Sequence, residues 1–146
     1  MTFEVRKARA EDADAIVEVL DHVPFLKDRY RGEAGIFLVE NNLDMIWLAD
    51  LGGRVASVMI LRKDLGRLEI SLIVTKAEFR RRDFARGLIH KAKRIAAESE
   101  VELVAHTEND ISRDLFISEQ FRLVPEAQNK QGHPMYRFSG KQIEPS

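Results

Sequence analysis

The densest group of chemistry-bearing side chains lies between Lys76 and Arg94, where eight basic and two acidic residues give a local net charge of +6. Three consecutive arginines, Arg80, Arg81 and Arg82, stand where an expected strand ends and an expected helix begins. The unpaired backbone N–H groups of a helix start attract anions. A guanidinium group adds two parallel hydrogen bonds to one phosphate. The pattern therefore favours a phosphate-binding loop over the alternative, a solvated basic helix face.

His106 is a second candidate, because it lies at the end of the apolar run 101–107, which is typical of a strand. An unperturbed imidazole has a pKa of about 6.5, which suits a general base. The alternative is a solvated histidine at a strand end. The other histidines show no metal-ligand spacing, and we expect no metal. The chain also lacks cysteine, which excludes thiolate metal sites and acyl-cysteine chemistry.

The hydrophobic pattern predicts the elements that position these residues. The expected strands are 3–9, 46–51, 55–61, 68–75, 101–107, 122–124 and 135–138. Helices are expected from Ala13, from Phe84 and after a cap at Asn109 or Asp110, and the segment 34–40 fits either a short helix or a strand. Because a helix joins 68–75 to 101–107, these two strands are expected to be parallel. The order predicts an α/β fold, a mixed sheet with helices on both faces.

Two local features sharpen this prediction. Gly52-Gly53 between two β-rich runs is a strong hairpin signal. In the last helix, the apolar side chains are expected to be buried, together with the phenylalanine that follows it. These positions are Ile111, Leu115, Ile117 and Phe121.

Length and composition set the class of protein. The 146 residues, 45% apolar and 32% charged, fit one domain (1–146) with a polar tail at 140–146. A formal net charge of −1 argues against polyanion binding, so nucleic acid is not an expected partner. No apolar run approaches the ~20 residues of a membrane helix. We expect a soluble, cytoplasmic protein.

Two stretches resemble the GNAT superfamily of N-acetyltransferases. The first, 74–89, is similar to its acetyl-CoA signature, Gln/Arg-x-x-Gly-x-Gly/Ala after a strand ending in Val, with Arg80 and Ala85 at the first and last positions. The second, 103–121, is similar to Asn-x-x-Ala-x-x-Leu-Tyr-x-x-x-Gly-Phe, with Asn109, Leu115 and Phe121 in register. With the opening strand and helix, the resemblance spans about residues 3–138.

The resemblance implies a fold and a reaction. The fold is a mostly antiparallel central sheet with a parallel, splayed strand pair. The reaction takes an acetyl group from acetyl-CoA, leaving CoA, to a small-molecule or protein amine that attacks the thioester directly. The implied cofactor-binding residues are Leu72, Ile73 and Val74 for the pantetheine arm, Arg80, Arg81, Arg82, Phe84, Ala85 and Arg86 for the phosphates, and Asn109 and Phe116 near the thiol. The family also makes a homodimer plausible.

The resemblance also suggests a base and an acceptor region. Glu69 stands eleven residues before Arg80, where some family members place a Glu that acts as base through water. A cross-strand salt bridge is the alternative for Glu69. The segment 21–45, with Phe25, Tyr30 and Arg31, corresponds to the region that covers the acceptor pocket in similar proteins.

Three positions depart from the family pattern. Asp83 replaces a loop Gly, so we expect its carboxylate to cap the helix that starts at Phe84 and to occupy part of the anion site, which weakens cofactor binding. Phe116 replaces the Tyr that protonates the departing thiolate, and is expected to be a core residue. Tyr136 and Tyr30 are possible substitute acids. Gln120 replaces a Gly, and because left-handed backbone costs about 1 kcal/mol in other residues, the helix is expected to end differently. The leading prediction is an N-acetyltransferase, and the alternative is an acyl-CoA-binding protein with weak or absent catalysis.

Overall fold

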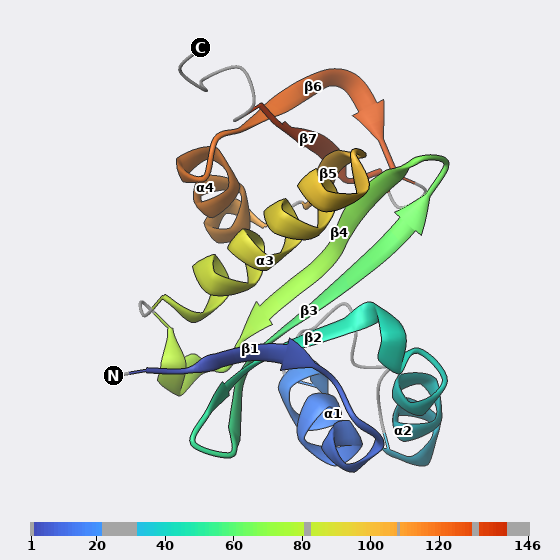
Figure 1. Cartoon of the computed structure of the whole chain (residues 1–146), viewed down its shortest axis with the longest axis vertical. Coiled ribbons are helices and arrows are strands. Elements are labelled where there is room, and N and C mark those ends of the chain that lie inside the picture. Colours follow the sequence, from blue (N-terminus) through green and yellow to red (C-terminus); the bar gives the residue numbers. More distant parts are fainter. Residues whose placement is uncertain (1, 22–31, 81–82, 108, 130–131, 140–146) are drawn as a thin grey trace. The chain divides into compact units, whose positions relative to one another are not determined.

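The computed structural model describes residues 2–21, 32–80, 83–107, 109–129 and 132–139 (Figure 1). Seven strands are hydrogen-bonded in the order β1-β2-β3-β4-β5-β7-β6. They are β1 (Glu4–Lys7), β2 (Ile46–Leu51), β3 (Arg54–Asp64), β4 (Arg67–Thr75), β5 (Glu102–His106), β6 (Phe121–Gln128) and β7 (Pro134–Phe138). The described residues also form the helices α1 (Ala13–Asp21), α2 (Gly32–Glu40), α3 (Phe84–Ser99) and α4 (Asp110–Ser118), and the short 3-10 helices η1 (Ala10–Asp12), η3 (Leu43–Met45) and η4 (Ala77–Phe79).

The strand pairing confirms the expected α/β sheet. Strands β4 and β5 are parallel, whereas β1 with β2, β2 with β3, β5 with β7 and β6 with β7 are antiparallel. The segment 34–40, which fitted a helix or a strand, is helical and belongs to α2. No helix in the described part of the chain is long and apolar enough to cross a membrane. The chain divides into two compact units, Met1–Ile60 with Ile73–Leu88, and Leu61–Leu72 with Ile89–Ser146.

In the first unit, the β2–β3 hairpin turns at Gly52 and Gly53, as expected, with φ of +58° and +90°. Both values suit glycine, because a side chain there would clash with the backbone. Helix α1 buries Ile16, Val19 and Leu20. The buried positions recur at the 3–4 residue spacing that places side chains on one helix face.

A network around Arg6 ties three elements of this unit together. Its Nη1 and Nη2 each lie 2.8 Å from a carboxylate oxygen of Asp12, and its Nε lies 2.9 Å from Asp50 Oδ2. Asp12 Oδ2 also accepts a 2.8 Å hydrogen bond from the backbone N–H of Arg9. The hydrogen bonds from Arg6 hold the pKa of Asp12 below its usual range, although burial opposes them. The guanidinium thus joins β1 to η1 and β2.

In the second unit, β5 lies between β4 and β7, and its Val104 and Ala105 have no solvent exposure. Phe116 on α4 is buried against Phe121, with ring centroids 5.2 Å apart. Asn109 caps α4, because its Oδ1 accepts hydrogen bonds from the N–H groups of Ile111 and Ser112. The predicted cap at this position is therefore confirmed.

The predicted burial of Ile111 and Ile117 is wrong, because these side chains are 75% and 52% exposed. Each step along an α-helix turns the side chain by about 100°, so the face that carries Phe116 inward points Ile117 outward. Leu115 is half-buried and Phe121 is buried. The apolar residues of α4 therefore do not form one buried stripe.

The end of α4 also differs from the prediction. Gln120 adopts the left-handed conformation, with φ of +74°, although it is not glycine. Its N–H donates to the carbonyl of Ile117, and its own carbonyl accepts hydrogen bonds from the N–H and the hydroxyl of Ser139, each 2.9 Å long. These bonds to the end of β7 offset the backbone cost, so the helix ends as if a glycine were present.

Candidate active site

The two base candidates named from the sequence lie side by side in the second unit. In the parallel β4–β5 ladder, Glu69 is opposite Val104. Successive side chains of a strand point to opposite faces, so Glu69, Val104 and His106 share one face of the sheet. Glu69 Oε2 contacts His106 Nδ1 directly, and the two side chains are only 11% and 4% exposed. Glu69 therefore has a cross-strand partner, as its alternative interpretation predicted, and that partner is His106, the second base candidate.

The environment of the pair favours a neutral imidazole. Burial lowers the pKa of His106, the attraction of Glu69 opposes this shift, and the positive charges of Arg67 and His133 add to it. When Nδ1–H donates to Glu69, Nε2 carries the lone pair. Nε2 is shielded from solvent and has no hydrogen-bond partner among the described residues. The arrangement can therefore accept a proton at Nε2.

Glu69 has further neighbours that sequence reasoning did not identify. The hydroxyl of Ser71, two residues along the same face of β4, donates to Glu69 Oε1 over 3.4 Å. Arg62 Nη1 lies 3.9 Å from the same oxygen. Arg67, Glu69 and Ser71 stand at every second position of a strand, and such residues share one face of it. This spacing could have predicted from the sequence that the three side chains are neighbours.

The edge of β4 that faces β5 has two different halves. Pairing with β5 covers Arg67 to Ile70, and among the described residues this ladder includes none from the second half of β4. In that half, the carbonyl of Val74 accepts a 2.9 Å hydrogen bond from Ser57 Oγ on β3. Neighbouring residues in a strand direct their backbone groups to alternate edges, so those of Ile73 point away from β3. Leu72, Ile73 and Val74 are half-buried.

The predicted phosphate loop is described in part, because Arg81 and Arg82 lie outside the described residues. Arg80 is exposed, and Ala85 and Arg86 are half-buried at the start of α3. Phe84 is buried beneath the loop, with its ring 5.7 Å from that of Phe79 and 4.8 Å from that of Phe3. The side chain of Phe84 is therefore part of the core and is not available to a ligand.

The Asp83 side chain is exposed in the described part of this loop. Its side chain is 80% exposed, and Oδ1 lies 3.4 Å from Arg86 Nη1. Its backbone carbonyl accepts from the N–H of Gly87, as expected of the residue preceding a helix. The carboxylate therefore faces solvent beside an arginine.

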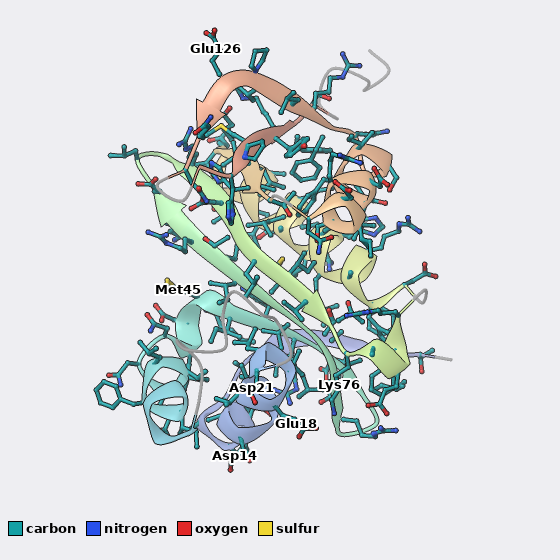
Figure 2. The ribbon with its side chains drawn as sticks, turned by 180° about the vertical axis from the view of Figure 1, so that it is seen from behind. Asp14, Glu18, Asp21, Met45, Lys76 and Glu126 are labelled. Carbon is teal, nitrogen blue, oxygen red and sulfur yellow. The ribbon has the colours of Figure 1, made fainter. Side chains whose placement is uncertain are left out.

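Lys76, which lies just before the predicted phosphate loop, forms ion pairs with two glutamates of the same unit. Lys76 Nζ lies 2.9 Å from Glu18 Oε1 on α1 and 3.8 Å from Glu78 Oε1 (Figure 2). Phe25, Tyr30 and Arg31, named for the acceptor region, lie outside the described residues. No group of three metal-ligating side chains occurs in the described part of the chain.

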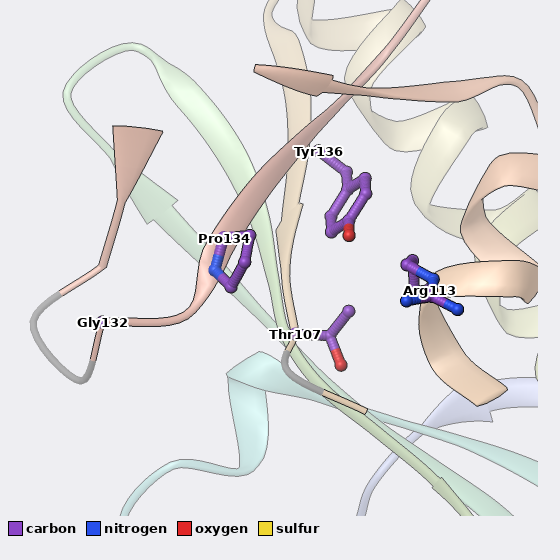
Figure 3. Close-up of a pocket in the computed structure, with 5 residues that line it drawn as sticks. All are labelled: Thr107, Arg113, Gly132, Pro134 and Tyr136. Carbon is purple, nitrogen blue, oxygen red and sulfur yellow. The ribbon is translucent and has the colours of Figure 1, made fainter. Parts of the chain in front are cut away.

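A pocket of about 380 Å³ opens at the carboxyl end of β5. It is lined by Thr107, Arg113, Gly132, Pro134 and Tyr136 (Figure 3). Arg113 is ion-paired with Asp110 and Asp114, at 3.0 and 3.3 Å. Tyr136 is paired with Ala105 and His106 with Met135, so Tyr136 and His106 lie on opposite faces of the sheet. The tyrosine considered as a substitute acid therefore lines a different surface from the Glu69–His106 pair.

The chain was compared with protein families, with curated sequences and with solved structures. Residues 9–119 match the model of the acetyltransferase (GNAT) family. No curated protein sequence matches the chain. The structure is similar to PaiA N-acetyltransferase from Thermoplasma acidophilum, solved with coenzyme A, with a TM-score of 0.79 and 14% identity over 94% of this chain and 98% of that one.

Two further solved structures have the same fold. One is diaminobutyrate acetyltransferase EctA from Paenibacillus lautus, solved with L-2,4-diaminobutyric acid and coenzyme A, with a TM-score of 0.71 and 13% identity over 93% of each chain. The other is N-acetylglutamate synthase from Neisseria gonorrhoeae, with a TM-score of 0.77 and 13% identity over 94% of this chain and 35% of that one. At such identities the similarity concerns the fold.

Proposed function

Because the chain belongs to the GNAT family of acetyltransferases, we propose that it moves an acetyl group from acetyl-CoA to an amine by direct attack of the amine on the thioester. The observation that carries the proposal is the buried Glu69–His106 pair, which presents an unoccupied imidazole nitrogen. An amine attacks only when it is neutral, and an acceptor ammonium must first lose a proton. A neutral buried imidazole supplies this base.

The residues present fit coenzyme A in three respects. The half of β4 from Ser71 to Thr75 has backbone groups, those of Ile73 among them, directed away from β3 and available to an extended pantetheine arm. The start of α3 offers backbone N–H groups beside the exposed Arg80. Asp83, the expected obstacle, directs its carboxylate to solvent. When bound, acetyl-CoA supplies an activated acyl group with a thiolate as the leaving group.

Further residues would hold the cofactor. Arg86 and the amides of 81–86 would bind its phosphates, as the family resemblance implies. Asn109 uses its side-chain oxygen to cap α4, so its NH₂ group is the end available to a ligand near the thiol. Phe116 offers only apolar contact there, because its buried ring lacks a hydroxyl.

The chain's own part in the reaction is proton removal and orientation. His106 Nε2 accepts the proton of the acceptor ammonium, while Glu69 holds Nδ1–H and stabilises the imidazolium that forms. Glu69 is thus a positioning residue. Ser71 and Arg62 contact Glu69 and orient its carboxylate. No side chain need protonate the thiolate, because a thiol with a pKa of about 8.5 would be a tolerable leaving group unaided, and the absence of a hydroxyl at Phe116 is consistent with this.

The second candidate function is binding of acyl-CoA without chemistry. The observation that favours it is the burial of Phe116 in place of a hydroxyl-bearing side chain. Both candidates predict that coenzyme A binds the chain, and they differ in turnover.

A paired experiment separates the two. Calorimetric titration with CoA measures binding, and release of free thiol from acetyl-CoA in the presence of a broad amine panel measures transfer. Binding together with amine-dependent thiol release supports the acetyltransferase. Binding without thiol release supports the binding protein, and no heat at millimolar CoA overturns both. The matched variant His106→Gln keeps a polar side chain and should bind CoA without transferring acetyl groups.

A further inference from the structure

Hydrogen-bonding groups that are buried without partners gather at one place in the second unit. Among the described residues, the buried side-chain nitrogens without a hydrogen-bond partner belong to Arg67 and His106. Of these, His106 Nδ1 faces Glu69, which leaves Arg67 Nε and His106 Nε2. Buried polar groups in folded proteins are nearly always satisfied, and exceptions indicate a ligand or a water that completes the site.

The strand register places the side chains of Arg67 and His106 on the same face of the sheet. Arg67 and Glu69 are two residues apart on β4 and share the face that carries His106. Met135 on β7 is the direct cross-strand neighbour of His106. Arg67 Nη1 reaches Met135 Sδ, at 4.0 Å. The guanidinium therefore extends from β4 across β5 to the residue beside His106.

The chemistry of the two nitrogens is complementary. Arg67 Nε–H can only donate a hydrogen bond. His106 Nε2 accepts one, because Nδ1–H is donated to Glu69. A ligand that satisfies both must present an acceptor to Arg67 and a donor to His106.

The charges on this surface indicate which acceptor is favoured. Arg67 and Arg62 contribute two positive charges and Glu69 one negative charge, the imidazole of His106 is neutral, and the ion pair of Arg137 with Glu102 on the same face cancels, so these groups leave a net positive charge. An anionic oxygen therefore balances the site better than a neutral one. A planar carboxylate matches the geometry of a guanidinium group.

We propose that the acceptor is a small amine that also carries a carboxylate, an amino acid in the chemical sense, whose carboxylate accepts a hydrogen bond from Arg67 Nε and whose amine donates to His106 Nε2. This inference rests on the proposed function and names its substrate class. Arg67 is then a specificity-determining residue, distinct from the base.

Matched acceptor pairs test the substrate class. Each pair is an amino acid and the amine left when its carboxylate is removed, such as lysine with 1,5-diaminopentane, 2,4-diaminobutyrate with 1,3-diaminopropane, and phenylalanine with phenethylamine. The measured quantity is kcat/KM for acetyl transfer by the full chain. We expect at least one pair in which the amino acid exceeds its decarboxylated partner by 10-fold or more, since a charge-assisted hydrogen bond contributes about that factor.

The variant Arg67→Gln makes the test specific. It should lower kcat/KM for the amino acid about 10- to 100-fold more than kcat/KM for the decarboxylated amine, mainly through KM. The change is read as the ratio of the two reactions, because Arg67 also acts on the pKa of His106 and so affects both. A retained reaction with the decarboxylated amine shows that the variant is folded. The control Arg122→Gln replaces an exposed arginine on β6 and should alter neither reaction.

The outcomes distinguish this inference from the function on which it rests. If decarboxylated amines react as well as or better than the amino acids in all pairs, the inference is overturned while acetyl transfer stands. The same holds if Arg67→Gln lowers both members of a pair equally, or if a water alone satisfies the two nitrogens and no carboxylate preference appears. If CoA binds but no amine of any kind is acetylated, the proposed function fails, and the substrate class with it.

Discussion

Glu69 on β4 and His106 on β5 meet through one imidazole nitrogen, and the other nitrogen of the ring is buried without a partner among the described residues. The parallel register that sets Glu69 opposite Val104 creates this contact, because it brings both side chains to one face. The pair therefore depends on backbone pairing, and both of its members are buried. This rigidity suits a base that must remain neutral and oriented.

The first prediction concerns the pH dependence of kcat. Since burial lowers the pKa of His106, the base is already neutral at pH 7, and kcat should fall only as acidification protonates the ring at a pH below its ordinary value of about 6.5. Glu69→Gln removes the attraction that raises this pKa, so the acid limb should move to still lower pH. Arg67 and His133, the other charged groups that act on the ring, both lower its pKa and do not oppose this direction.

The measurement is kcat between pH 5 and 8 at saturating acceptor. His106→Gln should lower kcat by about 10²- to 10⁴-fold and abolish the acid limb. A limb that stays in place in Glu69→Gln, or that persists in His106→Gln, would show that another group is the base.

The second prediction concerns the Arg6 network of the first unit. Arg6→Ala leaves the poorly exposed Asp12 and Asp50 without their cation, so the free energy of unfolding should fall by about 3–5 kcal/mol. Urea denaturation at pH 7 measures the change. The control Asp14→Asn alters an exposed residue at the start of α1 and should change stability by less than about 0.5 kcal/mol.

The same network predicts an acid sensitivity. Because the folded pKa of Asp12 lies below its unfolded value, the stabilisation is complete above the unfolded pKa of about 3.9 and is lost as the pH falls through the folded value. The stability difference between the wild type and Arg6→Ala should therefore shrink below pH 4. A difference that is constant from pH 7 to pH 2 would contradict the role of the ionised Asp12.

The third prediction concerns the end of α4. The left-handed backbone of Gln120, with φ of +74°, is strained for any residue with a side chain but not for glycine. Gln120→Gly should therefore raise the free energy of unfolding by up to about 1 kcal/mol. Thermal unfolding should show a rise in Tm of about 3 °C. The control Gln120→Ala removes the same side chain but keeps the cost, and should give no rise. Stabilisation by alanine as great as that by glycine would refute this reason.

The fourth prediction concerns the loop before α3. The Asp83 carboxylate is exposed beside the proposed phosphate site, so Asp83→Asn should lower the Kd for CoA about two- to fivefold at low salt. The gain should shrink in 0.5 M salt, because exposed charges are screened. Glu98→Gln, near the other end of α3, is the matched control. Equal effects of the two substitutions would indicate net charge alone.

The sequence predicted those features that local chemistry determines. The hairpin at Gly52-Gly53 and the cap at Asn109 follow from turn and cap preferences, and the structure has both. Glu69 and His106 were each named singly. Their contact was not predictable, because the register of β4 against β5 depends on packing between distant segments.

Other features needed the tertiary structure for the same reason. The outward direction of Ile111 and Ile117 depends on which face of α4 meets Phe121. The left-handed Gln120 depends on hydrogen bonds from Ser139, which is distant in the sequence. Arg67 gave a signal in its alternation with Glu69, but the absence of a partner for its Nε is visible only in the folded chain. The homodimer and the location in the cell remain predictions.

The most direct test of the account is amine-dependent release of free thiol from acetyl-CoA by the full chain, compared with its His106→Gln variant. The account predicts release by the wild type that requires both acetyl-CoA and an amine, together with a loss of about 10²- to 10⁴-fold in the variant while CoA still binds. Thiol release that is absent across the amine panel, or that is as fast without His106, would contradict it.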